Sequence, residues 1–129
     1  MLKLTSLMIG TGNPEAMTKF YEAVFKTPMD PMMGWQFGEF SFMVMEHSEV
    51  KGKNTEGPRH IFNLEATDVK GEFERIKDIE GAAVIKEPYQ MTMEGEVVEI
   101  GKETDDGFWI ATLADPDGNY FQLMSPWNG

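Results

Sequence analysis

The stretch that decides the fold is "LADPDGNYFQLMSP", which runs from Leu113 to Pro126. Its Asp-Pro-Asp-Gly-Asn segment contains the residue types that favour successive positions of a tight turn, and Gly118 or the asparagine after it tolerates a positive φ. Polar and apolar residues then alternate, as they do in a strand with one buried face. We therefore predict a turn between two antiparallel strands, with Tyr120, Gln122 and Met124 on one face of the last strand.

Length and composition set limits on the kind of protein. A chain of 129 residues with 41% apolar residues is long enough to bury the core of a single globular domain. The net charge of −11 opposes binding to nucleic acid. The chain has no cysteine for a disulfide or a thiolate-bound zinc ion, and no apolar run of the roughly 18 residues that a membrane span requires. A cytoplasmic protein without a membrane or nucleic-acid partner is expected.

The first half predicts a strand, a helix and further strands. "LKLTSLMIG" (Leu2–Gly10) alternates like a strand, and a helix follows that begins after Asn13, a good N-cap, with Pro14 at its first position. Helical spacing places one apolar stripe on it, formed by Met17, Phe20, Tyr21, Val24 and Phe25. The runs "WQF" and "EFSFMVMEH" read as strands, and the polar segment 48–59 reads as a linker.

The second half repeats this order. "HIFNLEA" (His60–Ala66) reads as a strand, and Thr67 or Asp68 caps a helix that is expected to end at Gly81. Its apolar stripe consists of Val69, Phe73, Ile76 and Ile79. "AAVIKEPYQM", "FWIATLA" and "NYFQLMS" are the strands that follow, and the two helix caps are 55 residues apart.

The repeat predicts an α+β fold made of two tandem βαβββ units. The first unit is expected over about 1–47, the linker over about 48–59 and the second unit over about 60–126. One such unit cannot bury both faces of its sheet, so two curved sheets would form a half-barrel around a concave cavity.

Three segments carry a resemblance to a known group of proteins. These are "FYEAVF" at the end of the first helix, the repeated strand–helix–strands unit, and "DPDGNYFQL" before the C-terminus. Together they resemble the vicinal oxygen chelate superfamily, which includes glyoxalase I, the bleomycin-resistance proteins and the extradiol dioxygenases. "DVKGEFERIK", "KEPYQ" and "WIATLADPDGNYFQLMSP" are most similar to uncharacterised glyoxalase-like proteins of that superfamily.

The resemblance implies positions for a metal site, which members build from four side chains in the concave sheet. Counting from the helix caps and the last turn gives Ser6, Ile61 and Gln122, and Glu46 is the plausible ligand on the remaining strand. Serine is a poor ligand for a divalent transition metal and isoleucine is none, so no metal or other cofactor is expected. The alternative is a divalent metal held by His60, Glu46 and Gln122 after a slip in strand register, although alternation places His60 with the opposite face.

The cavity lining predicts a pocket for a small organic molecule. Alternation in the second unit directs Ile61, Asn63 and Glu65 into the cavity, and Phe62, Leu64 and Ala66 toward the helix. The expected substrate-binding residues are Ser6, Met8, Trp35, Phe42, Asn63, Trp109, Tyr120, Gln122 and Met124. An amide inside such a cavity needs partners, and a ligand or an ordered water would supply them to Gln122.

The sequence alone does not decide whether the protein is a catalyst or how its chains assemble. Glu46 or Glu65 would act as a general base only if buried, and the acidic segment Glu94–Gly107 is either a lid or an extension of a hairpin. A metal-independent glyoxalase-like binding protein is expected. The alternatives are a metal-dependent lyase like lactoylglutathione lyase and a drug-sequestering protein of the bleomycin-resistance type. The apolar tail with Trp127 favours a homodimer.

Overall fold

A computed structural model of the chain describes residues 1–105 and 107–126. It divides the chain into two compact units, residues 1–53 and 54–129. The boundary falls inside the segment predicted as a linker. Each unit is a mixed sheet with one helix, so the α+β fold class is confirmed. Neither helix of the described residues is long and apolar enough to cross a membrane.

The first unit is βαββ and has one strand fewer than predicted after its helix. It consists of β1 (Ser6–Thr11), α1 (Pro14–Phe25), β2 (Trp35–Phe37) and β3 (Phe40–Glu46). The sheet order is β1-β3-β2, with β1 parallel and β2 antiparallel to β3. Between α1 and β2 a single bridge joins Asp30 and Gly34. Two prolines in this segment lack the amide that a further strand would need for its ladder.

The helix α1 has the predicted start and the predicted buried stripe. The Asn13 side chain accepts a hydrogen bond from the Ala16 amide at 3.4 Å, and Pro14 is the first helical residue. The chain leaves the helix through Lys26, whose φ of 56° is left-handed. The side chains of α1 that face the sheet are Met17, Phe20, Tyr21 and Val24, which are all buried.

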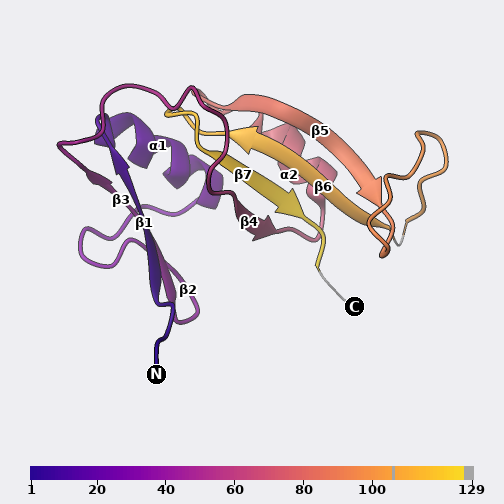
Figure 1. The fold of residues 1–129 in the computed structure, drawn as a ribbon, viewed down its shortest axis with the longest axis horizontal. Helices are drawn as coiled ribbons and strands as arrows, with labels where there is room; N and C mark the ends of the chain where they lie inside the picture. Colours follow the sequence, from indigo (N-terminus) through magenta and orange to yellow (C-terminus); the bar gives the residue numbers. More distant parts are fainter. Residues whose placement is uncertain (106, 127–129) are drawn as a thin grey trace. The chain divides into compact units, whose positions relative to one another are not determined.

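The second unit has the predicted βαβββ order. It consists of β4 (Phe62–Glu65), α2 (Val69–Ile76), β5 (Ala83–Met91), β6 (Phe108–Ala114) and β7 (Tyr120–Met124). The sheet order is β4-β7-β6-β5, with β4 parallel to β7 and the other pairs antiparallel. Figure 1 shows α2 behind β5, β6 and β7, so the helix covers one face of this sheet.

The helix α2 is shorter than predicted. Asp68 is its N-cap and accepts a hydrogen bond from the Gly71 amide at 3.0 Å. The helix ends at Ile76, and Ile79 lies in the turn that follows, where its amide donates to the Ile76 carbonyl. Gly81 then takes a φ of +96°, so it marks the end of this turn rather than the end of the helix.

The strand β5 lies at the edge of the sheet and contains Pro88. Its pairing with β6 shifts register between Lys86 and Tyr89, which leaves room for the proline within a bulge. After β5, an antiparallel bridge joins Met91 to Val97. The acidic segment therefore begins as an extension of the hairpin, which was one of the two predicted forms.

The turn between β6 and β7 has the predicted antiparallel geometry and is held by Asp115. The Asp115 carboxylate, in a residue that is 3% exposed, accepts hydrogen bonds from the amides of Asp117 and Asn119 at 2.9 and 3.0 Å. Gly118 has a φ of +82°, and Asn54 donates to the Asp117 and Gly118 carbonyls. The start of the second unit is thereby fastened to the turn that fixes the register of its last strand.

We predict that Gly118→Ala lowers the free energy of unfolding by more than Gly95→Ala does. Both glycines have a positive φ, +82° and +90°, so each change carries a left-handed cost of about 1–2 kcal/mol. Only the new Cβ at position 118 would approach a backbone oxygen, that of Asn54, at 2.6 Å. Urea unfolding of both variants measures the difference, and equal losses would contradict this role for the turn.

Candidate functional site

The candidate site is the face of the four-stranded sheet opposite α2, which we call the open face. The helix-facing side carries Leu113, Phe121 and Leu123, which are 2% exposed or less. On β7 the residues between them, Tyr120, Gln122 and Met124, are half-buried, so the predicted alternation of this strand is confirmed. The same alternation holds on β4.

A row of polar side chains crosses the open face over all four strands. On β7, Gln122 is paired with Asn63 of β4 on one side and with Thr112 of β6 on the other. Thr112 is in turn paired with Lys86 of β5. Paired residues in a sheet point to the same side, so the four side chains form a line. Thr112 is buried, Gln122 is half-buried, and the two edge residues are exposed. We call Asn63, Gln122, Thr112 and Lys86 the polar row.

Less polar side chains border the polar row on both sides. The next row toward the end of β7 pairs Met124 with Ile110, and Ile110 with Tyr89. On the other side, Tyr120 is paired with Ala114. The open face therefore offers hydrogen-bonding groups along one line within a surface of aromatic and aliphatic carbon.

The hydrogen bonding of the polar row is incomplete. Within the described residues the Gln122 amide makes one side-chain hydrogen bond, in which its nitrogen donates to the Thr112 hydroxyl at 3.4 Å. That distance is at the long end of the range for an N–H···O bond, and the amide oxygen remains available as an acceptor. At the edge the Lys86 ammonium lies 5.5 Å from the Tyr89 ring centroid, a distance at which a cation–π attraction is weak.

Gln90 provides a contrast, because there both the nitrogen and the oxygen of the side-chain amide form hydrogen bonds. Its side chain is 2% exposed, donates to the Thr104 carbonyl at 2.7 Å and accepts from the Thr104 amide at 3.0 Å. Gln90 thus has a structural role, because it holds Thr104 of the acidic segment Glu94–Gly107, which we call the acidic loop. Gln122 has no comparable pair of bonds, so its amide oxygen is free to accept a hydrogen bond from outside the described residues.

Two predicted binding residues of the first unit lie on the equivalent helix-free face of their own sheet. Ser6 and Met8 on β1 are paired with Ser41 and Met43 on β3, opposite the side that packs on α1. Ser6 is exposed, and Met8 is 49% exposed. Their contact with a ligand stays a prediction.

Trp35 and Phe42 do not lie on that face, and their predicted position is wrong. They are 3% and 4% exposed and pack with Tyr21 and Phe25 of α1, with ring centroids 5.2 Å apart between Tyr21 and Phe42. Trp35 is paired with Phe42, so both point to the helix side. The Trp35 indole also donates to the Thr27 carbonyl at 2.9 Å. These two side chains belong to the core.

Trp109 is also placed on the other side of its sheet from the open face. It lies two residues before Ala111 and four before Leu113, so alternation directs it toward α2, and Lys70 of that helix lies over its ring. There it lines a cavity of about 970 Å³ together with the start of α2 and the acidic loop.

The residues at the metal positions implied by the superfamily resemblance do not form a suitable ligand set. Ser6 and Ile61 remain poor ligands, and Ile61 lies just before β4 with 42% of its surface exposed. In the alternative set, Glu46 is at the end of β3 and His60 lies before β4, and both are exposed. No group of three or more histidine and acidic side chains that could hold a metal occurs among the described residues. Glu65 is exposed as well, so the burial on which a general base depended is missing.

Sequence reasoning missed part of the polar row. Thr112 and Lys86 were not predicted, because the register between neighbouring strands is needed to place them beside Gln122. The bulge near Pro88 hides that register from a count along the chain. The sequence contains one signal for this site, which is the charged residue Lys86 within the strand segment "AAVIKEPYQM". Alternation alone, however, does not assign Lys86 to either face of the sheet.

Comparison by sequence finds no known family that matches the chain. A search of curated proteins gives no match either. Comparison by structure does find relatives. A glyoxalase/bleomycin resistance protein from Albidiferax ferrireducens T118 aligns with a TM-score of 0.66 and 16% identity, over 95% of this chain and 98% of that one.

Two further structures have the same fold. A glyoxalase/bleomycin resistance protein/dioxygenase family enzyme from Burkholderia phytofirmans PsJN aligns with a TM-score of 0.61 and 23% identity, over 96% of this chain and 98% of that one. A glyoxalase I mutant from Zea mays aligns with a TM-score of 0.69 and 18% identity, over 98% of this chain and 45% of that one. The predicted resemblance to the vicinal oxygen chelate superfamily is thus confirmed for the fold.

We predict that Gln122→Met changes the free energy of unfolding by less than about 0.5 kcal/mol, because one long hydrogen bond is lost and apolar contact is gained. Gln90→Met is the matched comparison and should cost about 2 kcal/mol, since two good hydrogen bonds of about 1 kcal/mol each disappear. Thermal or urea unfolding of the two variants gives both values. A loss at position 122 as large as that at position 90 would mean that Gln122 serves stability.

Proposed function

We propose that this protein binds a small organic molecule on the open face of its second sheet, and that binding needs no metal. The observation that supports this proposal is the polar row, in which Gln122 has an unused amide oxygen in the middle of a half-buried sheet. Binding sites for small molecules combine an apolar lining with a few polar groups that fix orientation. The polar row and its two apolar borders have that composition.

The arrangement of the rows favours a particular kind of ligand. Lys86 offers an ammonium at one end of the polar row, and Asn63 offers an amide at the other. Met124 and Tyr89 on the bordering row suit a flat or branched hydrocarbon part. We expect a compound with an anionic or carbonyl group near Lys86, a hydrogen-bond donor for the Gln122 amide oxygen and an apolar part over Met124.

Relatives with the same fold are described as glyoxalase and bleomycin resistance proteins. Those descriptions include both a catalyst and a resistance protein, so they support binding of small molecules without selecting a reaction. The ligand set at the implied metal positions, with Ser6 and Ile61, favours the metal-independent alternative over a lyase of the glyoxalase I type. We therefore propose binding as the function and assign no catalytic residue.

We predict that soluble fragments with a carboxylate, an N–H donor and an aromatic ring shift the backbone amide resonances of Asn63, Thr112 and Gln122 in ¹H–¹⁵N NMR titrations. Gln122→Met should weaken a fragment that binds there about fivefold, the effect of losing the one neutral hydrogen bond that the amide oxygen accepts from the fragment. Addition of EDTA should leave the affinity unchanged.

Lys86→Met should weaken the same fragments, and Lys77→Met provides the matched control. Lys77 lies at the end of α2, on the other side of the sheet, so its removal should have no effect on binding. Binding that appears only after Zn²⁺ or Mn²⁺ is added would overturn the metal-independent proposal. Shifts confined to residues outside the open face would overturn the site.

We also propose a homodimer, with the helix-free face of the first sheet as the contact. Met8 and Met45 lie on that face, and each is 49% exposed. Methionine side chains adapt to a partner surface, and exposed apolar patches of this kind commonly mark contacts. Trp127, on which the sequence-based prediction of a dimer rested, lies outside the described residues.

Light scattering after gel filtration should give twice the chain mass of 14.6 kDa. Met45→Lys should shift the protein toward the monomer, because a charge would be buried in the contact. Met32→Lys is the control, since Met32 is 84% exposed in the loop before β2. A monomer at high protein concentration, or an equal effect of both changes, would refute the proposed contact.

A further inference from the structure

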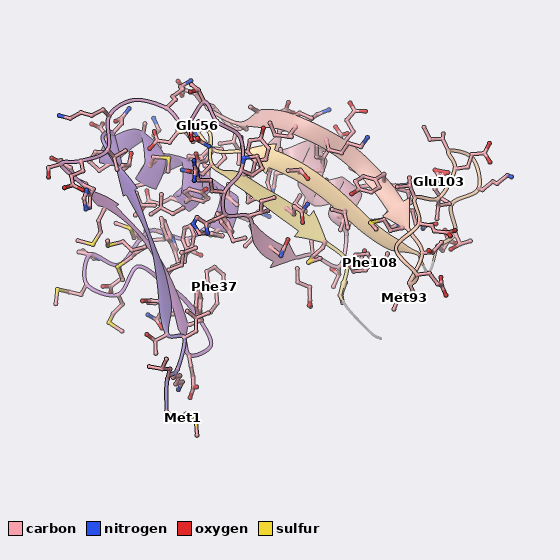
Figure 2. All side chains as sticks on the ribbon, viewed as in Figure 1. Met1, Phe37, Glu56, Met93, Glu103 and Phe108 are labelled. Carbon is pink, nitrogen blue, oxygen red and sulfur yellow. The ribbon has the colours of Figure 1, made fainter. Side chains whose placement is uncertain are left out.

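The cavity at the start of α2 lies at one end of the four-stranded sheet, beyond the polar row and the two rows that border it. It is a cleft, partly open to solvent, with a volume of about 970 Å³, and it is bounded by the first turn of α2, the end of β5, the acidic loop and the start of β6. Figure 2 shows Met93, Glu103 and Phe108 at this end of the four-stranded sheet. A volume of this size is within the range of sites for drug-sized molecules.

One wall of the cavity already holds a cation. The Lys70 ammonium lies 3.8 Å from the centroid of the Trp109 ring, and both residues line the cavity. Tryptophan is the aromatic side chain that attracts cations most strongly. Lys70 is exposed on a flexible stem, so its ammonium can leave the ring at small cost. The geometry identifies a position where a positively charged nitrogen is stabilised.

The charge around the cavity favours positive ligands. Asp68, Glu103 and Asp105 line it, and of its two lysines Lys102 is paired with Glu99 at 3.0 Å. The backbone amide of Gly101, which donates to the Glu103 carboxylate, holds the pKa of that group below its usual range, and the charge of Lys70 adds a smaller effect in the same direction. Glu103 is therefore ionised near neutral pH.

The wall that carries these carboxylates is preformed. The two hydrogen bonds between Gln90 and Thr104, one donated and one accepted by Gln90, fix Thr104, which lies between Glu103 and Asp105. Gly107 approaches so closely that any side chain there would overlap the Gln90 amide. A ligand that binds here does not have to order this part of the loop, which lowers the cost of binding.

The remaining lining combines polar residues such as Thr92 and Ser125 with an apolar part, and that apolar part argues against simpler ligands. Met91, Met93, Val98 and Phe108 supply aliphatic and aromatic surface. A bare metal ion gains nothing from such groups, and the described residues contain no set of three acidic or histidine side chains around one point. An anion would be repelled by the excess of carboxylates.

We propose that this cavity is a second binding site, specific for an organic cation with an apolar body, such as an alkyl- or arylammonium compound. The ligand nitrogen takes the place of the Lys70 ammonium on the Trp109 ring, and the carboxylates of Glu103 and Asp105 balance its charge. In the absence of ligand, Lys70 occupies the cation position and competes for it. This site is independent of the open face and of the function proposed for it.

The test uses benzyltrimethylammonium as the probe and benzyl alcohol as the uncharged comparison. The Trp109 indole N–H resonance should shift saturably with the cation and far less with the alcohol. The combined change Glu103→Gln and Asp105→Asn should weaken binding about tenfold, and added salt should weaken it in the unmodified protein.

Lys70→Met gives the sharpest result. Removal of a competing ammonium should tighten binding of the cation about threefold, a change in the range of an exposed cation–π contact. Lys77→Met, at the C-cap of the same helix, should leave the affinity unchanged, as should Gln122→Met on the open face. Both lysines lie outside the core, so each variant should fold, with only the small loss of stability expected for a surface contact.

Weaker or unchanged binding in Lys70→Met would overturn the proposal, because it would show that Lys70 does not compete with the ligand. Equal binding of benzyl alcohol would overturn it too, since the site would then select an aromatic ring rather than a charge. Shifts that appear on the open face and disappear with Gln122→Met would assign the cation to that face instead.

Discussion

The structure depends on burial of one side of each sheet against a single helix. In each unit one amphipathic helix covers one face, and the strands alternate so that their large apolar residues meet it. In the second unit this fixes Phe121 and Leu123 toward α2, and with them the opposite direction of Gln122. The turn at Asp115 preserves this register, because its carboxylate holds the two amides that set where β7 begins.

The open face results from the same arrangement, because it is the side of the sheet that does not pack against the helix. Side chains on it are not needed to bury α2, so a row of polar groups can exist there at little cost to the core. The Gln90 amide, which has a structural role, uses both its nitrogen and its oxygen in hydrogen bonds with Thr104. The Gln122 amide does not use both, although it is half-buried. Sites retained for binding commonly carry polar groups that stability alone would not select. This contrast between two glutamines is the physical basis for placing a ligand on the open face.

The turn signals, helix caps and strand alternation were readable from the sequence because they are local. Asn13, Asp68 and the Asp-Pro-Asp-Gly turn required only neighbouring residues, and Tyr120, Gln122 and Met124 followed by alternation. The prediction put three aromatic residues, Trp35, Phe42 and Trp109, in the cavity because aromatic side chains often line binding pockets. Strand register instead directs them toward a helix. The positions of Lys86 and Thr112 could not be predicted, because they depend on how β5 pairs with β6, and a bulge alters that pairing. The contact of Gln90 with Thr104 spans an irregular loop that no periodicity describes.

The central claim is that the open face binds an organic molecule through Gln122 without a metal. A crystal structure of the protein grown with a fragment that shifts the Gln122 resonance tests it most directly. The account predicts electron density for the fragment within hydrogen-bond distance of the Gln122 amide, beside Thr112 and Asn63. Density for a cation held there by three or more protein atoms would contradict it and would make a metal-dependent enzyme the better description.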